Sequence, residues 1–270
     1  MARSSETTGP EKNIRMNEDS RAVAQNYDYP AGGYAAQESR AAAIKAAPPI
    51  PDYLQDTYWW AYLHPKALHI FEREWVVNLI LWGNMRKLTQ AVISDMAVRP
   101  HSRVLQVACV YGEFSNLLAA HLERNGSRLE LVDVAPIQLM NVREKLAGQR
   151  NVEYHHQDSS ALSFAAGSFD QTVVFFLLHE QPEAVRRETI AEAIRVTRPG
   201  GKVIFVDYHG PRRRNPFRYV MKPVLTWLEP FAMDLWRQEL PAFMPATVRP
   251  EQLRSEFYFG GLYQKVVLTV

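Results

Sequence analysis

The chain has 270 residues, with 31 Lys and Arg against 29 Asp and Glu, so its formal net charge is only +2. A balance this close to zero argues against an extended phosphate-binding surface, and we expect no nucleic-acid partner. The single cysteine, Cys109, cannot form an internal disulfide, which excludes a disulfide-stapled secreted scaffold. No apolar stretch reaches the roughly 20 residues that a membrane-spanning helix needs.

The first 98 residues divide into two parts. Residues 1–48 are rich in Ser, Glu, Arg and Ala without an apolar block, so we expect a disordered tail that lacks the core of a signal peptide. This pattern favours a cytoplasmic protein. Residues 49–98 differ, because Phe71, Trp75, Leu79 and Trp82 fall at helical spacing. We predict a helical cap over residues 49–98.

From residue 99 to residue 270, short apolar strands alternate with helices. We predict strands at 103–107, 129–132, 152–155, 171–178 and 202–206, helices at 113–123, 136–146 and 182–196, and a hairpin at 257–270 that turns at Gly260 and Gly261. This alternation predicts a Rossmann-like α/β fold: a mostly parallel seven-stranded sheet that ends in a C-terminal antiparallel hairpin. Residues 211–240 form an aromatic and basic insertion.

In such a sheet the ligand binds beyond the carboxyl ends of the strands. Here the first strand-to-helix turn reads Val-Ala-Cys-Val-Tyr-Gly over residues 107–112, Asp133 closes the second strand, Asp158 follows the third, and a Pro-Gly-Gly turn at 199–201 precedes the fifth. These four motifs, in this order, resemble the class I methyltransferases, whose first turn usually reads D-x-G-x-G-x-G. The resemblance implies that residues 99–270 form an S-adenosylmethionine-binding domain.

The resemblance also implies which residues contact the cofactor. They are Gln106, Ala108, Val110, Gly112, Asp133 and Asp158. Asp133 stands where the family's carboxylate accepts from both ribose hydroxyls, and Asp158 where it meets the adenine amino group. Taken singly, either Asp is more often a cap or turn residue. Gln106, Ala108 and Val110 depart from the family pattern, which predicts an altered methionine end of the site.

A more specific resemblance rests on three segments. Tyr-Trp-Trp-Ala-Tyr-Leu-His-Pro at 58–65, the turn at 107–112 and Tyr-His-Gly at 208–210 are together similar to the rhodoquinone-biosynthesis family. Membership implies that ubiquinone is the lipid substrate and that one ring methoxy group is exchanged for an amino group. It also implies S-adenosylmethionine as the amino donor and a divalent metal such as manganese.

Candidate catalytic residues follow the fourth and fifth strands. An amination needs a general base, and His179 and His209 are the first choices because imidazole titrates near neutrality. Glu180 and Asp207, with one of these histidines, would suit manganese. Tyr111, in the cofactor turn, is a third catalytic candidate. The alternative is structural, since a histidine after a buried strand is commonly a hydrogen-bonding residue.

The segment 212–236 opens with three arginines and continues with dense aromatic and aliphatic residues. This composition predicts either a lid over the active site or a peripheral contact with the inner face of a membrane. Three functions stay open at this point. They are quinone amination, conventional S-adenosylmethionine-dependent methylation of a quinone or small molecule, and cofactor binding without catalysis.

Overall fold

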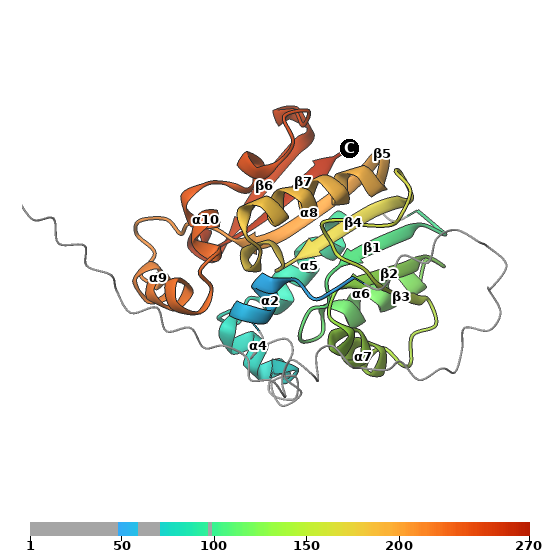
Figure 1. Cartoon of the computed structure of the whole chain (residues 1–270), viewed down its shortest axis with the longest axis horizontal. Coiled ribbons are helices and arrows are strands. Elements are labelled where there is room, and N and C mark those ends of the chain that lie inside the picture. Colours follow the sequence, from blue (N-terminus) through green and yellow to red (C-terminus); the bar gives the residue numbers. More distant parts are fainter. Residues whose placement is uncertain (1–47, 59–70, 97–98) are drawn as a thin grey trace, which may run out of the picture.

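The computed structural model describes residues 48–58, 71–96 and 99–270 (Figure 1). The predicted tail at 1–48 falls almost entirely outside the described residues, as does most of the motif at 58–65. Among the described residues, none of the helices combines the length and apolar character required to cross a bilayer.

Seven strands form one mixed sheet, as predicted. They are β1 (Arg103–Val107), β2 (Arg128–Asp133), β3 (Val152–His156), β4 (Phe169–Phe175), β5 (Thr197–Tyr208), β6 (Leu253–Tyr258) and β7 (Tyr263–Thr269). Their order is β3-β2-β1-β4-β5-β7-β6, and only β7 runs antiparallel to its neighbours β5 and β6. The strand order reverses between β1 and β4, where ligands bind in open α/β sheets.

The helices pack on both faces of the sheet or around its carboxyl edge (Figure 1). The α-helices are α2 (Asp52–Thr57), α4 (Glu74–Ile80), α5 (Met85–Asp95), α6 (Phe114–Glu123), α7 (Pro136–Lys145), α8 (Glu183–Val196), α9 (Phe217–Leu228) and α10 (Ala232–Arg237). The short 3-10 helices are η2 (Leu178–Glu180), η3 (Leu240–Phe243), η4 (Pro250–Gln252) and η5 (Phe259–Gly261).

Alternating residues of the central strands build two separate cores. Val104 of β1 packs with Leu118 of α6, whereas its neighbour Leu105 packs with Ile190 of α8, on the opposite face. This alternation is the two-residue period of a strand, and it explains why the central strands read as continuous apolar runs. Truncating Leu118, which is fully buried, to alanine would cost about 2 to 5 kcal/mol of stability.

Three predicted strand boundaries were wrong, the first being the start of the hairpin, which we predicted at residue 257 and which begins with β6 at Leu253. We predicted the fourth strand over residues 171–178, but β4 ends at Phe175, because Phe176 adopts a positive φ of 52° and turns the chain into η2. We predicted the fifth strand over 202–206, but β5 extends over Thr197–Tyr208 and absorbs the Pro-Gly-Gly turn. A Cβ at Gly201 would lie 2.5 Å from the carbonyl oxygen of Asp170, so only glycine fits there.

The insertion at 211–240 contains two helices that differ in character. In α10, Ala232 and Leu235 are buried in the domain. In α9, Met221 and Leu225 face inward, whereas several other apolar side chains are exposed. Only α9 therefore offers an apolar surface to the outside.

Candidate active site

A cavity of about 590 Å³ opens at the carboxyl ends of β1, β2, β4 and β5. Helices α4 and α9 and the start of α2 complete its walls, which are mostly apolar. Its volume is typical of sites that hold a cofactor or a small ligand. The cavity lies where the strand order reverses, so the fold and the cavity indicate the same place for a binding site.

The turn after β1 lines one end of this cavity through Ala108, Cys109, Val110 and Tyr111. Ala108 adopts a positive φ of 70°, a conformation in which glycine is the usual residue. The predicted contacts of Ala108 and Val110 with a ligand are thus compatible with the structure. The altered end of the turn faces the cavity.

Gln106 and Gly112, also predicted to contact the cofactor, do not line the cavity. Gln106 is fully buried beneath the turn, where its Nε2 donates to the carbonyl oxygen of Ala108 at 2.9 Å and to Oγ of Ser115 at 2.8 Å. Gly112 faces Val77 with a φ of 77°. The hydrogen bonds of Gln106 therefore stabilise the turn, and the positive φ of Gly112 directs the chain from the turn toward α6.

Asp133, at the end of β2, lines the cavity and is tied to the turn. Its Oδ2 accepts a hydrogen bond from the backbone N–H of Cys109 at 2.7 Å, and its Oδ1 accepts one from Ala135 at 2.8 Å. Burial raises the pKa of this carboxyl, and the two backbone donors oppose that shift. The Cys109 thiol also hydrogen-bonds to this carboxylate, and the lone pairs that remain can accept from ligand hydroxyls.

Asp158 is not among the residues that line the cavity. Its Oδ1 accepts from the backbone N–H and the hydroxyl of Ser160, both at 2.8 Å, and so stabilises the turn after β3. Its neighbour Ser159 lines the cavity instead. In this structure Asp158 has the role of a turn residue, which was the alternative reading of its position.

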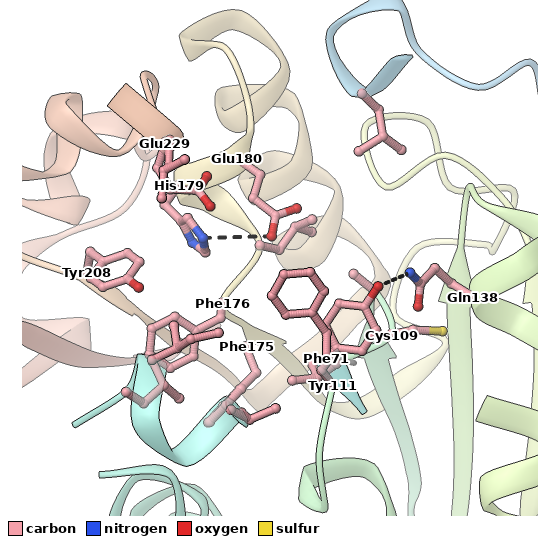
Figure 2. A pocket seen from close by; sticks show the side chains of 18 of the residues that line it. Phe71, Cys109, Tyr111, Gln138, Phe175, Phe176, His179, Glu180, Tyr208 and Glu229 are labelled. Atoms are coloured by element: carbon pink, nitrogen blue, oxygen red, sulfur yellow. Dashed lines mark hydrogen bonds and ion pairs between the residues drawn. The ribbon is translucent and has the colours of Figure 1, made fainter. Parts of the chain in front are cut away.

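Tyr111 projects into the cavity, as Figure 2 shows, and its hydroxyl accepts from Nε2 of Gln138 at 2.8 Å. Its ring stacks on Phe71 with centroids 5.7 Å apart. Burial raises the pKa of the phenol, so Tyr111 stays protonated at neutral pH. It can orient a ligand by hydrogen bonding, whereas a role as a proton acceptor is disfavoured.

His179 and Asp207 form a buried pair at the opposite end of the cavity. Nδ1 of His179 donates to Oδ1 of Asp207 at 2.9 Å, and Oδ2 of Asp207 accepts from the backbone N–H groups of Leu178 and His179. Burial lowers the pKa of His179, but the Asp207, Glu180 and Glu229 carboxylates outweigh it and raise the pKa to about 9. Asp207 therefore orients and charges the imidazole.

The predicted manganese ligands are not assembled. Both oxygens of Asp207 accept hydrogen bonds from protein donors, and one of these donors is Nδ1 of His179, whereas Glu180 lies at the other ring nitrogen, Nε2 (Figure 2). Within the described residues, the metal-type cluster found is elsewhere, at Glu130, Glu153 and His155, where Glu130 already pairs with Arg103. The donor set that we predicted does not fit a metal ion.

His209 is also placed differently from the prediction. Its Nδ1 donates to the carbonyl oxygen of Gly261 at 2.8 Å, and its ring packs against Phe257. His209 does not line the cavity, because β5 ends at Tyr208 and His209 contacts the end of the β6–β7 hairpin instead. His209 has the structural role that we had considered as the alternative.

Sequence reasoning missed two groups that line the cavity: Glu229, directly after α9, and Tyr53 in α2. Glu229 lies close to His179 (Figure 2) and hydrogen-bonds to the Tyr58 hydroxyl, and burial raises the pKa of Glu229. Tyr53 lines the cavity directly. The sequence did set Glu229 apart, because it is the first acidic residue after Asp207 and lies in a mostly basic and apolar segment.

The His179–Asp207 pair predicts a pH-dependent stability. His179 holds its proton to about pH 9 in the fold but would release it near 6.5 when unfolded. The pair's stabilisation is therefore complete below pH 6.5 and lost as the pH rises to about 9. We expect the free energy of unfolding in urea to fall over this range, and the His179→Gln variant to show a flatter slope. Equal slopes would contradict the assignment.

This arrangement of strands, turn and cavity defines the class: a protein with the class I S-adenosylmethionine methyltransferase fold. Residues 104–201 match the family model described as a methyltransferase domain. A demethylmenaquinone methyltransferase from Staphylococcus aureus (strain JH9) is 28% identical over 134 residues, which are 50% of this chain and 54% of that protein. The chain therefore spans about half the length of the curated relatives it matches.

Solved structures support the fold. A protein from Bordetella parapertussis, described as a possible exported protein, is similar with a TM-score of 0.55 and 18% identity over 68% of this chain and 67% of that one. The N-methyltransferase NodS from Bradyrhizobium japonicum WM9, in complex with S-adenosyl-L-homocysteine, gives a TM-score of 0.50 and 15% identity over 77% of this chain and 97% of its own. At these identities the similarity shows the fold alone.

Proposed function

We propose that this chain is an S-adenosylmethionine-dependent transferase that aminates a quinone, exchanging a methoxy group of ubiquinone for an amino group. The observation that carries the proposal is Ala108, which lines the cavity with a positive φ of 70°. A residue with a Cβ costs roughly 1 to 2 kcal/mol in this conformation, and glycine would avoid that cost. A strained side chain retained at a cavity supports a functional role for it.

The residues at the β1 end of the cavity suit this cofactor. Asp133 would accept from the ribose hydroxyls, and the turn from Ala108 to Tyr111 would contact the methionine end. When bound there, S-adenosylmethionine supplies both an activated methyl group and an α-amino group. The Cβ groups of Ala108 and Val110 restrict how closely the backbone approaches a ligand, which supports a different orientation of that amino group.

The remaining walls suit a flat apolar substrate and a proton transfer. Phe71, Phe175 and Phe176 line the cavity and offer ring faces and edges to a quinone. His179, held by Asp207, faces the same space and can accept a proton once its imidazole is neutral. Our proposal assigns no step to manganese, because the predicted ligands do not fit it.

Conventional methylation is the second candidate, and one observation favours it. Residues 104–201 match a methyltransferase domain, and the curated relative that we describe is named for methylating demethylmenaquinone. This second candidate would methylate a quinone or another small molecule, so the two candidates differ in the group transferred. A non-catalytic cofactor-binding protein is disfavoured, because His179, Glu180 and Glu229 converge on the cavity.

The double variant Ala108→Gly/Val110→Gly tests the proposal. We expect glycine to relieve the strain at residue 108, while the second glycine removes the packing of Val110 against the hydrophobic core, so the double variant gains no net stability. We also expect unchanged cofactor affinity through Asp133. Single-turnover amination should fall roughly a hundredfold, since a misplacement of about 1 Å costs that much in rate.

The matched control is Val110→Ala, which keeps a Cβ at both positions of the turn and should retain most of the amination. Full amination by the double-glycine variant would remove the link between this turn and the chemistry. A gain of methyl transfer by the same variant would indicate that the turn decides which group is donated.

A further inference from the structure

The mouth of the cavity is bordered by exposed apolar side chains from two helices that are far apart in the sequence. Leu79 and Ile80 of α4 and Val224 of α9 line the cavity and are also exposed to solvent. The two helices meet here, because Nε1 of Trp82 donates to Sδ of Met221 and the Trp82 ring packs against Phe217 with centroids 4.6 Å apart. We call the exposed apolar side chains of α4 and α9, with Trp82, the apolar rim.

The largest members of the apolar rim are unusually exposed. Trp227 is 82% exposed, Tyr219 is 74%, and Trp75 and Leu79 are each 63%. Scattered exposed apolar residues need no explanation, but a group of large ones on the two helices that border a cavity mouth marks an interaction surface. The partner must therefore offer apolar groups at the point where ligands enter.

The charges around the apolar rim identify the kind of partner. The segment 212–228 carries five cations and no Asp or Glu, and Glu74, which opens α4, is followed by residues 75–94 without a further acidic residue. The cations of the first segment are Arg212, Arg213, Arg214, Arg218 and Lys222. A helix with tryptophan and leucine on one side and cations beside them is typical of segments that lie in the interface of an anionic bilayer.

We infer that the apolar rim docks on the surface of an anionic lipid bilayer, with the cavity mouth facing the lipid. An apolar substrate would then pass from the bilayer into the cavity without crossing water. This inference goes beyond the proposed function, because the surface would serve any substrate dissolved in the membrane. It also extends the sequence prediction for residues 212–236, since α4 and Trp82 together supply half of the rim, whereas α10 buries its apolar residues Ala232 and Leu235 in the domain.

Sedimentation with lipid vesicles tests this inference on the full chain, without cofactor or quinone. We expect binding to vesicles of phosphatidylcholine mixed with phosphatidylglycerol and much weaker binding to phosphatidylcholine alone. Trp227→Ser should lower the partition coefficient about tenfold or more, because one buried tryptophan side chain contributes at least that much. Arg213→Gln/Arg214→Gln should lower it about fivefold per charge, with less effect at high salt.

Two matched controls lie away from the apolar rim. Phe257 on β6 is 42% exposed, and the Arg249 side chain before η4 is 77% exposed. Phe257→Ser and Arg249→Gln should bind vesicles like the unmodified chain. No vesicle binding, or equal binding by Trp227→Ser, would overturn the inference. So would a dimer in sedimentation velocity that Trp227→Ser dissociates, since a second copy would then cover the rim. None of these readouts depends on which reaction the protein catalyses.

Discussion

The Asp133→Ala variant is expected to bind S-adenosylmethionine about 30- to 150-fold more weakly than the unmodified chain. The carboxylate lies in the cavity at the end of β2, where the two ribose hydroxyls would lose their shared acceptor. Loss of such a charge-assisted interaction costs about 2 to 3 kcal/mol, which corresponds to that range of affinity. Isothermal titration calorimetry measures the change directly.

Two further variants make this result specific. Asp133→Asn keeps an oxygen for one of the two backbone donors, Cys109 and Ala135, and so separates loss of the ligand contact from loss of the turn. Asp158→Ala should change the affinity little, because Asp158 does not line the cavity. Unchanged affinity in Asp133→Ala would refute the cofactor site. Equal losses in Asp133→Ala and Asp158→Ala would restore Asp158 as a cofactor ligand.

The second large effect is expected at the buried pair. His179→Gln should lower the rate of the transfer step by roughly 10²- to 10⁴-fold, the usual contribution of a positioned general base. Because the pKa of His179 is raised to about 9, the unmodified protein should become more active with rising pH up to that value. A rate that falls over this range would show that the imidazole does not act as a base.

Asp207→Asn tests how the pair works. Removing the carboxylate charge should bring the pKa of His179 down toward its usual value, so the rising limb of the pH–rate profile should move to lower pH. The buried carboxylate also accepts from the N–H groups of Leu178 and His179, so we expect lower stability, measured by thermal unfolding. If Asp207 has only a structural role, the variant will be less stable, but the rising limb of its pH–rate profile will stay at the same pH.

The sequence predicted the sheet well because parallel central strands are buried on both faces. Short apolar runs between helices define β1, β2 and β3 closely, and the glycine pair defines the β6–β7 hairpin. Strand ends were harder to predict. The apolar run continues past Phe175, and only the positive φ of Phe176 ends β4, which no side-chain pattern reveals.

The sequence predicted those site residues that lie at or shortly after the carboxyl end of a strand. Asp133, and the proximity of His179 to Asp207, follow from the rule that parallel strands end at one edge. The role of Asp207 could not be read from the sequence, since its partners include the backbone N–H groups of η2. Glu229 was missed although a lid over the active site was one prediction for residues 212–236, because no sequence pattern indicates which side chain of that segment reaches the cavity.

The measurement that tests the central proposal most directly is mass spectrometry of the quinone after reaction with doubly labelled S-adenosylmethionine. The label would be ¹⁵N in the amino group and ¹³C in the sulfonium methyl group, with ubiquinone as substrate. The proposal predicts a product that has lost one methoxy group and gained ¹⁵N without ¹³C. A product that carries the ¹³C methyl group, or an unchanged quinone, would contradict it.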